Sequence, residues 1–304
     1  MHNILLYPNC KINLGLRVIR KREDGYHDLE TIFVPIYGLH DELEVRPLAL
    51  TDSAQDTNRY TFLQEGIAVD CNPEDNLIIK CYRQMAAKYP QIGPVSIRFK
   101  KQIPFGAGLG GGSSDAAHMA IALNELFELG LSKAQLAEEV KPLGADCPFF
   151  IYNTPCYAEG IGDRLTPIDL DMRGIHIVLV KPGEGVSTKE AYSGIKTHPE
   201  DAQRIKTAIA QSRKNLLSSD FPLSTILSND FEETVFPKHP IIAGIKKRLL
   251  DAGAFYASMS GSGSTVFGFF KHDAEGSTDA QLRVLQEEFA SMVLLNDTFG
   301  EWKA

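Results

Sequence analysis

The chain has little cysteine, one tryptophan and no long apolar run. Its 304 residues include five cysteines, and no two of them form a Cys-x-x-Cys pair. An odd number of scattered cysteines suits neither a disulfide scaffold nor a structural zinc site, and it is typical of a reducing compartment. The sequence also lacks a basic amino-terminal segment followed by an apolar core. We therefore expect no signal peptide, no transmembrane helix and a cytoplasmic location.

The chain also lacks an excess of positive charge. Its formal net charge is −8 at pH 7. This sign disfavours broad contact with nucleic acid or an anionic membrane, although it permits a locally positive pocket for phosphate. Apolar residues make up 43% of the chain and charged residues 23%. This is the composition of an ordinary globular protein, and the length suits one large or two ordinary domains.

Glycine is concentrated in one stretch, Pro104-Phe105-Gly106-Ala107-Gly108-Leu109-Gly110-Gly111-Gly112-Ser113-Ser114. Glycine tolerates positive φ and lets another group come close to the backbone. A helical pattern follows to about residue 128, and we expect Ser113 or Ser114 to cap it. Backbone N–H groups at a helix N-terminus attract anions, because the helix dipole points the same way. The stretch therefore predicts a phosphate-binding loop rather than a flexible Gly/Ser linker.

Two common phosphate loops do not fit this stretch. Gly106-x-Gly108-x-x-Gly111 formally matches the dinucleotide fingerprint, but a second helix, opened by a capping box at Ser132, follows where that fold needs a strand. A Walker A loop needs a lysine after its last glycine, and Ser113 stands there. What remains is a loop that binds phosphate through backbone amides, with serine hydroxyls as extra donors or metal ligands.

Four other residues are candidates for function. Lys11 lies in an apolar and amide-rich segment, where it is either a solvated surface charge or a point charge for phosphate. Tyr26 and His27 follow an Asp-Gly turn that should join two strands as a hairpin. They are either a polar tip or two rings placed for binding. Asp146, alone among small and apolar residues, is either a helix cap or a functional acid.

The remaining pattern mixes short strands with helices. We expect strands at 3–6, 12–18, 30–37, 42–46, 60–63, 95–99, 175–180, 255–259, 265–270 and 292–295, and helices at 77–88, 113–128, 240–252 and 278–289. After about residue 170 the strands flank a helix pair, which suggests an α+β layer of the split β-α-β kind. We place a domain boundary near 160–172.

Three motifs, at residues 8–14, 104–117 and 259–264, resemble in this order the motifs of the GHMP kinase superfamily. Its phosphate loop has the form Pro-x-Gly-x-Gly-Leu-Gly-Ser-Ser followed by a helix. The segments 22–27, 144–148 and 159–165 further resemble the branch of that superfamily that phosphorylates a cytidine-diphosphate-linked methylerythritol. The sequence carries Ala107, Asp115 and Ser260 where relatives often have Gly, Asn and Thr. None of these departures removes a group with an expected chemical role.

The resemblance implies an α+β fold of two domains. Residues 1–165 would form a ribosomal protein S5 domain 2-like domain, and residues 166–304 a ferredoxin-like domain. It also implies transfer of the γ-phosphoryl group of ATP, with Mg²⁺, to a hydroxyl group. Asp146 would accept the proton of that hydroxyl, and Lys11 would lie beside Asp146 and balance its charge. The glycine stretch from Pro104 to Ser114 would hold the ATP phosphates, while Asn76 and Lys101 would contact the nucleotide.

The resemblance also implies a set of substrate-binding residues. Tyr26 and Tyr192 would sandwich the cytosine ring, and His27 would hydrogen-bond to it. Asn13 would lie near the reacting hydroxyl. The expected partner is thus a small molecule, with no nucleic acid and no membrane, while the oligomeric state and the metal ligands stay open.

Two alternatives to this function remain. One is another GHMP kinase, of the homoserine or mevalonate type, which the Asp-Gly-Tyr-His turn disfavours. The other is a non-catalytic nucleotide-binding regulator on the same fold. The presence of both Lys11 and Asp146 disfavours a regulator, since a sensor needs no base.

Overall fold

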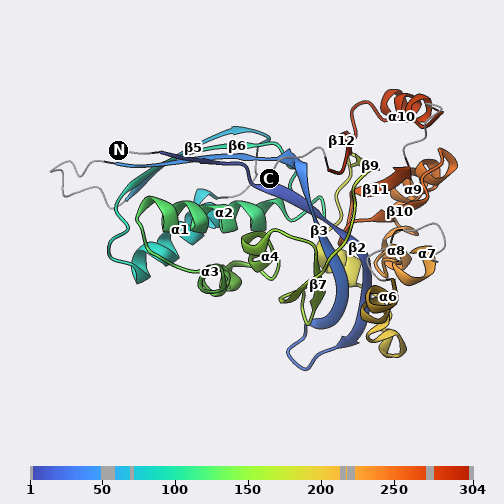
Figure 1. The fold of residues 1–304 in the computed structure, drawn as a ribbon, viewed down its shortest axis with the longest axis horizontal. Helices are drawn as coiled ribbons and strands as arrows, with labels where there is room; N and C mark the ends of the chain where they lie inside the picture. The colour runs from blue at the N-terminus through green and yellow to red at the C-terminus, as the bar shows by residue number, and fades with distance from the viewer. Residues whose placement is uncertain are drawn as a thin grey trace. The chain divides into compact units, whose positions relative to one another are not determined.

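The computed structural model describes residues 3–48, 59–68, 72–212, 217, 223–271 and 277–300. It divides the chain into two compact units, each built from separate segments (Figure 1). The first consists of residues 1–10, 39–105 and 110–154, and the second of residues 11–38, 106–109 and 155–304. The division into 1–165 and 166–304 did not anticipate this interleaving, and as a division into folding domains it stays a prediction.

The first unit is a four-stranded sheet with helices on one face (Figure 1). The strand order is β1 (Ile4–Leu6), β4 (Glu42–Pro47), β6 (Val95–Lys101) and β5 (Tyr60–Gly66). β6 runs antiparallel to β4 and parallel to β5. Its residues alternate between buried and more exposed positions, as its sequence pattern predicts. The helices of this unit are α1 (Leu77–Lys88), α2 (Gly111–Leu126), α3 (Lys133–Val140) and α4 (Cys147–Tyr152), with short 3₁₀ turns at Pro73–Asp75 and Lys141–Leu143.

The ends of these helices follow local capping rules, with one surprise. The Asn76 side chain caps α1 by accepting the Ile78 N–H at 2.9 Å, and Ser132 forms the predicted capping box before α3. The expectation that Ser113 or Ser114 caps α2 is wrong. The N-cap is Gly110, in the left-handed region with φ 71°, so both serines lie inside the first turn. A glycine that adopts positive φ lets the loop turn directly into the helix.

The second unit holds two four-stranded sheets. One has the order β2 (Asn9–Lys21), β3 (His27–His40), β7 (Cys156–Glu159) and β8 (Arg164–Pro167). The other has the order β10 (Tyr256–Met259), β11 (Val266–Lys271), β9 (Ile175–Val180) and β12 (Val293–Thr298), with every pair antiparallel. Residues 9–10 at the start of β2 and residues 39–40 at the end of β3 belong to the first unit. These two strands therefore carry the chain between the units.

Short helices make up the rest of the second unit. They are α5 (Thr188–Tyr192), α6 (Arg204–Ser212), α7 (Leu223–Ile226), α8 (Glu232–Val235), α9 (Pro240–Asp251) and α10 (Ser277–Glu288), with a 3₁₀ turn at Pro199–Asp201. The strand β8 was not predicted. The polar composition of residues 51–59 predicts an exposed loop, and most of that segment lies outside the described residues. In the described parts of the chain, no helix combines the length and the apolar character that crossing a membrane requires.

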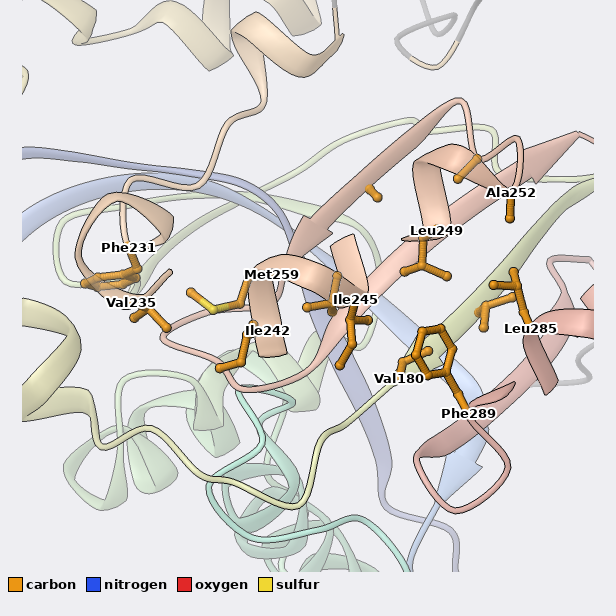
Figure 2. Packing of buried hydrophobic residues seen from close by; sticks show 14 of the residues in the cluster. Val180, Phe231, Val235, Ile242, Ile245, Leu249, Ala252, Met259, Leu285 and Phe289 are labelled. Carbon is orange, nitrogen blue, oxygen red and sulfur yellow. The ribbon is translucent and has the colours of Figure 1, made fainter. Parts of the chain in front are cut away.

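The core of the second unit forms where α9 packs on the sheet around β10 and β11 (Figure 2). Ile242, Ile245 and Leu249 recur at the spacing of one helix face and are buried. They pack in one cluster with Met259 of β10 and Leu285 of α10. Removing such side chains from water contributes about 1.5–3 kcal/mol each, which fixes α9 against the sheet.

Two isoleucines of α9 test this packing. Ile245 is 2% exposed, and Ile241, one turn earlier near the start of α9, is 57% exposed. We expect Ile245→Ala to lower the free energy of unfolding by about 2–5 kcal/mol, because it leaves a cavity in the cluster. Ile241→Ala should change it by no more than about 0.5 kcal/mol. Denaturant unfolding of both variants measures the difference, and equal losses would contradict the assigned core face.

Candidate active site

Lys11 and Asn13 lie side by side on β2, with both side chains inside the second unit. Lys11 is 3% exposed and Asn13 is 2% exposed, so Lys11 is not a solvated surface charge. The Lys11 ammonium donates to Asn13 Oδ1 at 2.5 Å and to the Gly108 carbonyl at 3.3 Å, and it lies 5.0 Å from the centre of the Phe33 ring. A buried cation is thus held against the first glycine loop.

Two glycine loops meet at this point of the second unit. The first consists here of residues 106–109, and the second of residues 260–264. The Lys11 N–H donates to the Leu109 carbonyl at 3.0 Å. Ser260 Oγ donates to the Gly108 carbonyl at 2.9 Å and accepts the Asn13 N–H at 3.2 Å. A Cβ on Gly108 would lie 2.1 Å from the Ser260 carbonyl oxygen, and Gly108 has φ 74°. The three motifs found in the sequence are therefore joined by backbone contacts that only glycine permits here.

Asn229 supports the second glycine loop and was missed in the sequence. Its Nδ2 donates to the Met259 carbonyl at 2.7 Å and to the Gly261 carbonyl at 2.8 Å. Its Oδ1 accepts the Phe231 N–H at 3.0 Å. Asn and Asp often cap backbone groups just before a helix, so the Asn-Asp pair ahead of α8 was the available signal. The region 199–240 otherwise shows only a broken helical pattern.

Residues 110–114 are the part of the glycine stretch that belongs to the first unit, and they contain the first turn of α2. Gly111 has no room for a side chain, since a Cβ there would lie 2.9 Å from Ile103 and 3.1 Å from Lys101 Nζ. Ser113 is partly exposed, whereas Ser114 is fully buried. The Ser114 carbonyl oxygen lies 2.8 Å from His118 Nδ1. The backbone N–H groups of such a turn have no acceptor within the helix. They suit an anion.

Lys101 is the centre of a buried ion network beneath this turn. Its ammonium donates to Asp41 Oδ2 and to Asp115 Oδ2, each at 2.6 Å, and all three residues are buried. Asp41 Oδ1 also accepts the backbone N–H of Gln102 at 2.5 Å and of Ile103 at 2.8 Å. The structure thus gives Lys101 two carboxylate partners inside the unit, and its contact with a nucleotide stays a prediction.

The charge of this network depends on the protonation of Asp115. Burial raises the pKa of Asp115 well above its usual range, Lys101 opposes this rise, and Asp41 adds to it. A protonated Asp115 leaves one carboxylate and one ammonium in the network. This balance keeps a net negative charge away from the helix N-terminus, where it would repel phosphate.

Asp146 directly precedes α4, and its side chain makes no capping hydrogen bond. Asp146 thus stands at the N-cap position without a side-chain capping bond, and its role as a functional acid stays a prediction. The residue is half-buried, and burial and then Asp146 itself help to raise the pKa of the neighbouring Cys147 thiol to about 12, so that thiol is neutral. Asp146 belongs to the first unit and Lys11 to the second, so the pairing of the two stays a prediction.

The aromatic residues expected around cytosine lie in the second unit. Tyr26 is 62% exposed at the tip of the β2–β3 hairpin, where Asp24 Oδ1 accepts its N–H at 3.1 Å. His27 is stacked on Tyr192, with ring centres 4.7 Å apart and planes 20° apart. The edge-to-face neighbour of Tyr192 is Phe231, at 4.8 Å. The structure thus brings His27, rather than Tyr26, onto a face of Tyr192.

Burial, followed by the charge of Lys21, lowers the pKa of His27. A neutral ring results at neutral pH, with one donor and one acceptor nitrogen. Such a ring can hydrogen-bond to a base, as the sequence predicts, whichever edge the base presents.

Residues 76–154 match the family model of the GHMP kinases N terminal domain, and residues 205–281 match that of the GHMP kinases C terminal domain. The 4-diphosphocytidyl-2-C-methyl-D-erythritol kinase of Bacteroides thetaiotaomicron is 46% identical over 268 residues, which are 88% of this chain and 92% of that one.

The chain belongs to the 4-diphosphocytidyl-2-C-methyl-D-erythritol kinase family of GHMP kinases. A crystal structure of a 4-(cytidine 5′-diphospho)-2C-methyl-D-erythritol kinase is 31% identical with a TM-score of 0.72, covering 95% of this chain and 96% of that chain. Homoserine kinase from Cytophaga hutchinsonii shares the fold at 16% identity, with a TM-score of 0.64, covering 96% of this chain and 91% of its own. This GHMP kinase is an ATP-dependent small-molecule kinase, and the predicted two-domain α+β fold is confirmed.

Gly108 and Gly106 form a matched pair that tests the contact between the two glycine loops. Both have positive φ, but a Cβ on Gly106 would meet nothing within 4 Å. We expect Gly106→Ala to cost about 1–2 kcal/mol of stability from backbone strain alone. Gly108→Ala should cost clearly more and lower kcat, because Ser260 must move. Thermal unfolding and steady-state kinetics measure both effects, and equal losses in the two variants would rule out a decisive Gly108–Ser260 contact.

Asp115→Asn tests the protonation of the ion network. Because the pKa of Asp115 is higher in the folded than in the unfolded state, its contribution to stability is full below about pH 4 and is lost as pH rises towards the folded pKa. An asparagine at this position does not titrate, so the variant does not lose this stability as pH rises. We expect the variant to gain stability relative to the parent as pH rises, by at most about 1.4 kcal/mol per pH unit. Urea unfolding from pH 4 to 8 measures it, and a difference independent of pH would show that Asp115 is ionised in the folded protein.

Proposed function

We propose that this kinase transfers the γ-phosphoryl group of ATP to the 2-hydroxyl of 4-diphosphocytidyl-2-C-methyl-D-erythritol. This is a step of the non-mevalonate, or methylerythritol phosphate, route to isoprenoid precursors. The observation that carries the proposal is the junction of Lys11, Gly108 and Ser260, which unites the three kinase motifs in one place. The 46% identity to a kinase named for this substrate supports it.

The glycine stretch would hold the ATP phosphates. Phosphoryl transfer depends chiefly on positioning and on neutralising charge. The left-handed Gly110 starts α2 abruptly, so that the free N–H groups of its first turn follow the loop directly. The buried Lys11 ammonium supplies a positive charge on the loop that replaces the missing Walker lysine. Asn76 and Lys101 would contribute from α1 and β6, near the nucleotide.

Asp146 would accept the proton of the attacking hydroxyl. It stands half-buried at the N-cap position of α4, where its side chain makes no capping hydrogen bond. Asn13 would orient the same hydroxyl. Its Nδ2 donates to Thr31 Oγ1 at 3.1 Å and its Oδ1 accepts from Lys11, so its amide is held in one orientation.

Tyr26, His27 and Tyr192 would recognise the cytosine. Stacking on an aromatic ring contributes about 1–3 kcal/mol per base. In the structure His27 covers one face of Tyr192, so a base held between Tyr26 and Tyr192 would use the other face of Tyr192 or displace His27. The neutral His27 would then hydrogen-bond to the edge of the base.

Mg²⁺ would accompany the ATP. The described residues contain no cluster of three or more His, Cys, Asp and Glu side chains able to hold a metal ion. They do offer the hydroxyls of Ser113 and Ser114 at the α2 N-terminus, of which Ser113 is partly exposed and Ser114 is buried. One or two protein oxygens suit Mg²⁺, which keeps several waters and binds substrate phosphates. The ion would neutralise phosphate charge during transfer.

The proposal is tested by measuring turnover of the parent enzyme with three acceptors and by measuring kcat of one variant. ADP release is measured with the cytidyl substrate, homoserine and mevalonate in turn, and we expect turnover with the first alone. Asp146→Asn should lower kcat by about 10²-fold or more, the usual contribution of a general base. Near-normal kcat in a folded variant would exclude that role for Asp146. No turnover with any of the three acceptors would favour a nucleotide-binding regulator.

A further inference from the structure

His239 joins two acidic side chains at the start of α9. It lies in the turn between α8 and α9, and its side chain is 15% exposed. Its Nδ1 lies 3.0 Å from Glu184 Oε2, and its Nε2 lies 3.0 Å from Glu190 Oε1. Neither the family resemblance nor the proposed chemistry uses this ring.

The two carboxylates belong to segments near the proposed cytosine site. Glu190 lies on α5, two residues before Tyr192. Glu184 lies in the loop that leads to α5, and its carbonyl accepts the hydroxyl of Ser264, in the second glycine loop, at 2.7 Å. α5 is also held by α8, because Thr234 Oγ1 donates to the Ala191 carbonyl at 2.7 Å. The position of α5 thus depends on its contacts with His239 and with α8.

The His239 ring can serve both carboxylates only when it is protonated. A neutral imidazole has one N–H, whereas an imidazolium has two and can donate to both partners at once. The hydrogen bond to Glu184 and then the one to Glu190 raise the pKa of His239 above its ordinary value. Charge-assisted hydrogen bonds of this kind are also stronger than neutral ones.

Several charged groups on α9 and in the preceding loop have partners of their own, and Lys238, next to His239, is exposed to solvent. On α9, Lys246 pairs with Glu232 of α8, Lys247 with Asp251 and Arg248 with Glu288 of α10. In the preceding loop, Lys181 donates to the Pro182 carbonyl at 3.0 Å. Glu184 and Glu190 are therefore the groups that set the charge of His239.

We propose that His239 is a positioning residue for substrate recognition, whose protonated ring clamps α5 and the preceding loop so that Tyr192 is presented to the cytosine. The clamp closes below the pKa of His239 in the folded protein and opens as pH rises through it. An open clamp frees α5 from His239, and Tyr192 loses its fixed place. This inference rests on the proposed function, because it assumes that Tyr192 binds the base.

The clamp is tested by the pH dependence of KM for the cytidyl substrate. In the parent protein we expect that KM to rise roughly fivefold or more as pH passes through the His239 pKa, while KM for ATP stays constant. His239→Gln, which cannot donate to both carboxylates, should show the high KM at every pH, with kcat little changed. Glu190→Gln removes one carboxylate, so it should move the rise in KM to lower pH. A parent-like KM and pH profile in folded His239→Gln would overturn the proposal.

His176→Gln is the matched control. His176 is a half-buried histidine of the same unit whose ring faces the neutral side chains of Thr298 and Asn296. We expect no change in KM for the cytidyl substrate or in its pH profile; a change like that of His239→Gln would show that the effect is not specific to the clamp.

Titration of the His239 ring by NMR separates the clamp from the proposed function. We expect a pKa above the ordinary value of about 6.5 in the full chain, falling in Glu190→Gln. A pKa at or below 6.5 would overturn the clamp even if the enzyme is active. If the chain never turns over the cytidyl substrate, the proposed function fails, and the role of His239 in recognition fails with it, whereas a flat KM in an active enzyme removes the clamp alone.

Discussion

The contact between Gly108 and Ser260 is the constraint on which the site depends. Two backbone segments, separated by about half the chain, come so close that the first residue cannot carry a side chain. Ser260 then donates to Gly108 and accepts from β2, and Lys11 completes the junction from β2. Sheet, loop and cation thus hold one another in place. Such rigidity suits a phosphoryl transferase, in which positioning contributes most of the catalysis.

A second constraint lies beneath the N-terminus of α2, where Asp41, Lys101 and Asp115 form a buried ion network. A buried ion pair contributes little net stability compared with apolar packing, but it is costly to break. Here Asp41 accepts two backbone N–H groups just after β6, and Lys101 joins Asp41 to Asp115 of α2. The network thus fixes the backbone just before the glycine stretch against α2.

Several local features could be predicted from the sequence with accuracy. The capping box at Ser132, the strand at 95–99 and the helices at 77–88 and 240–252 depend mainly on neighbouring residues, and they appear close to where they are expected. The start of α2 was misplaced by a few residues, because serine is the more usual cap and the left-handed state of Gly110 depends on the loop before it. The motifs themselves were enough to assign the kinase family, which the comparisons confirm.

What the sequence determined by itself was the set of chemical parts: a glycine loop before a helix, a lysine without a Walker motif, an isolated aspartate and an aromatic hairpin tip. Each is a short pattern with its own physical meaning. Only the tertiary structure decided that Lys11 is buried on the loop, that Lys101 is engaged by two aspartates, and that His27 rather than Tyr26 stacks on Tyr192. Asn229 and His239 gained their roles in the same way. These contacts join residues far apart in the chain, and their partners are set by the packing of whole elements, which no local pattern records.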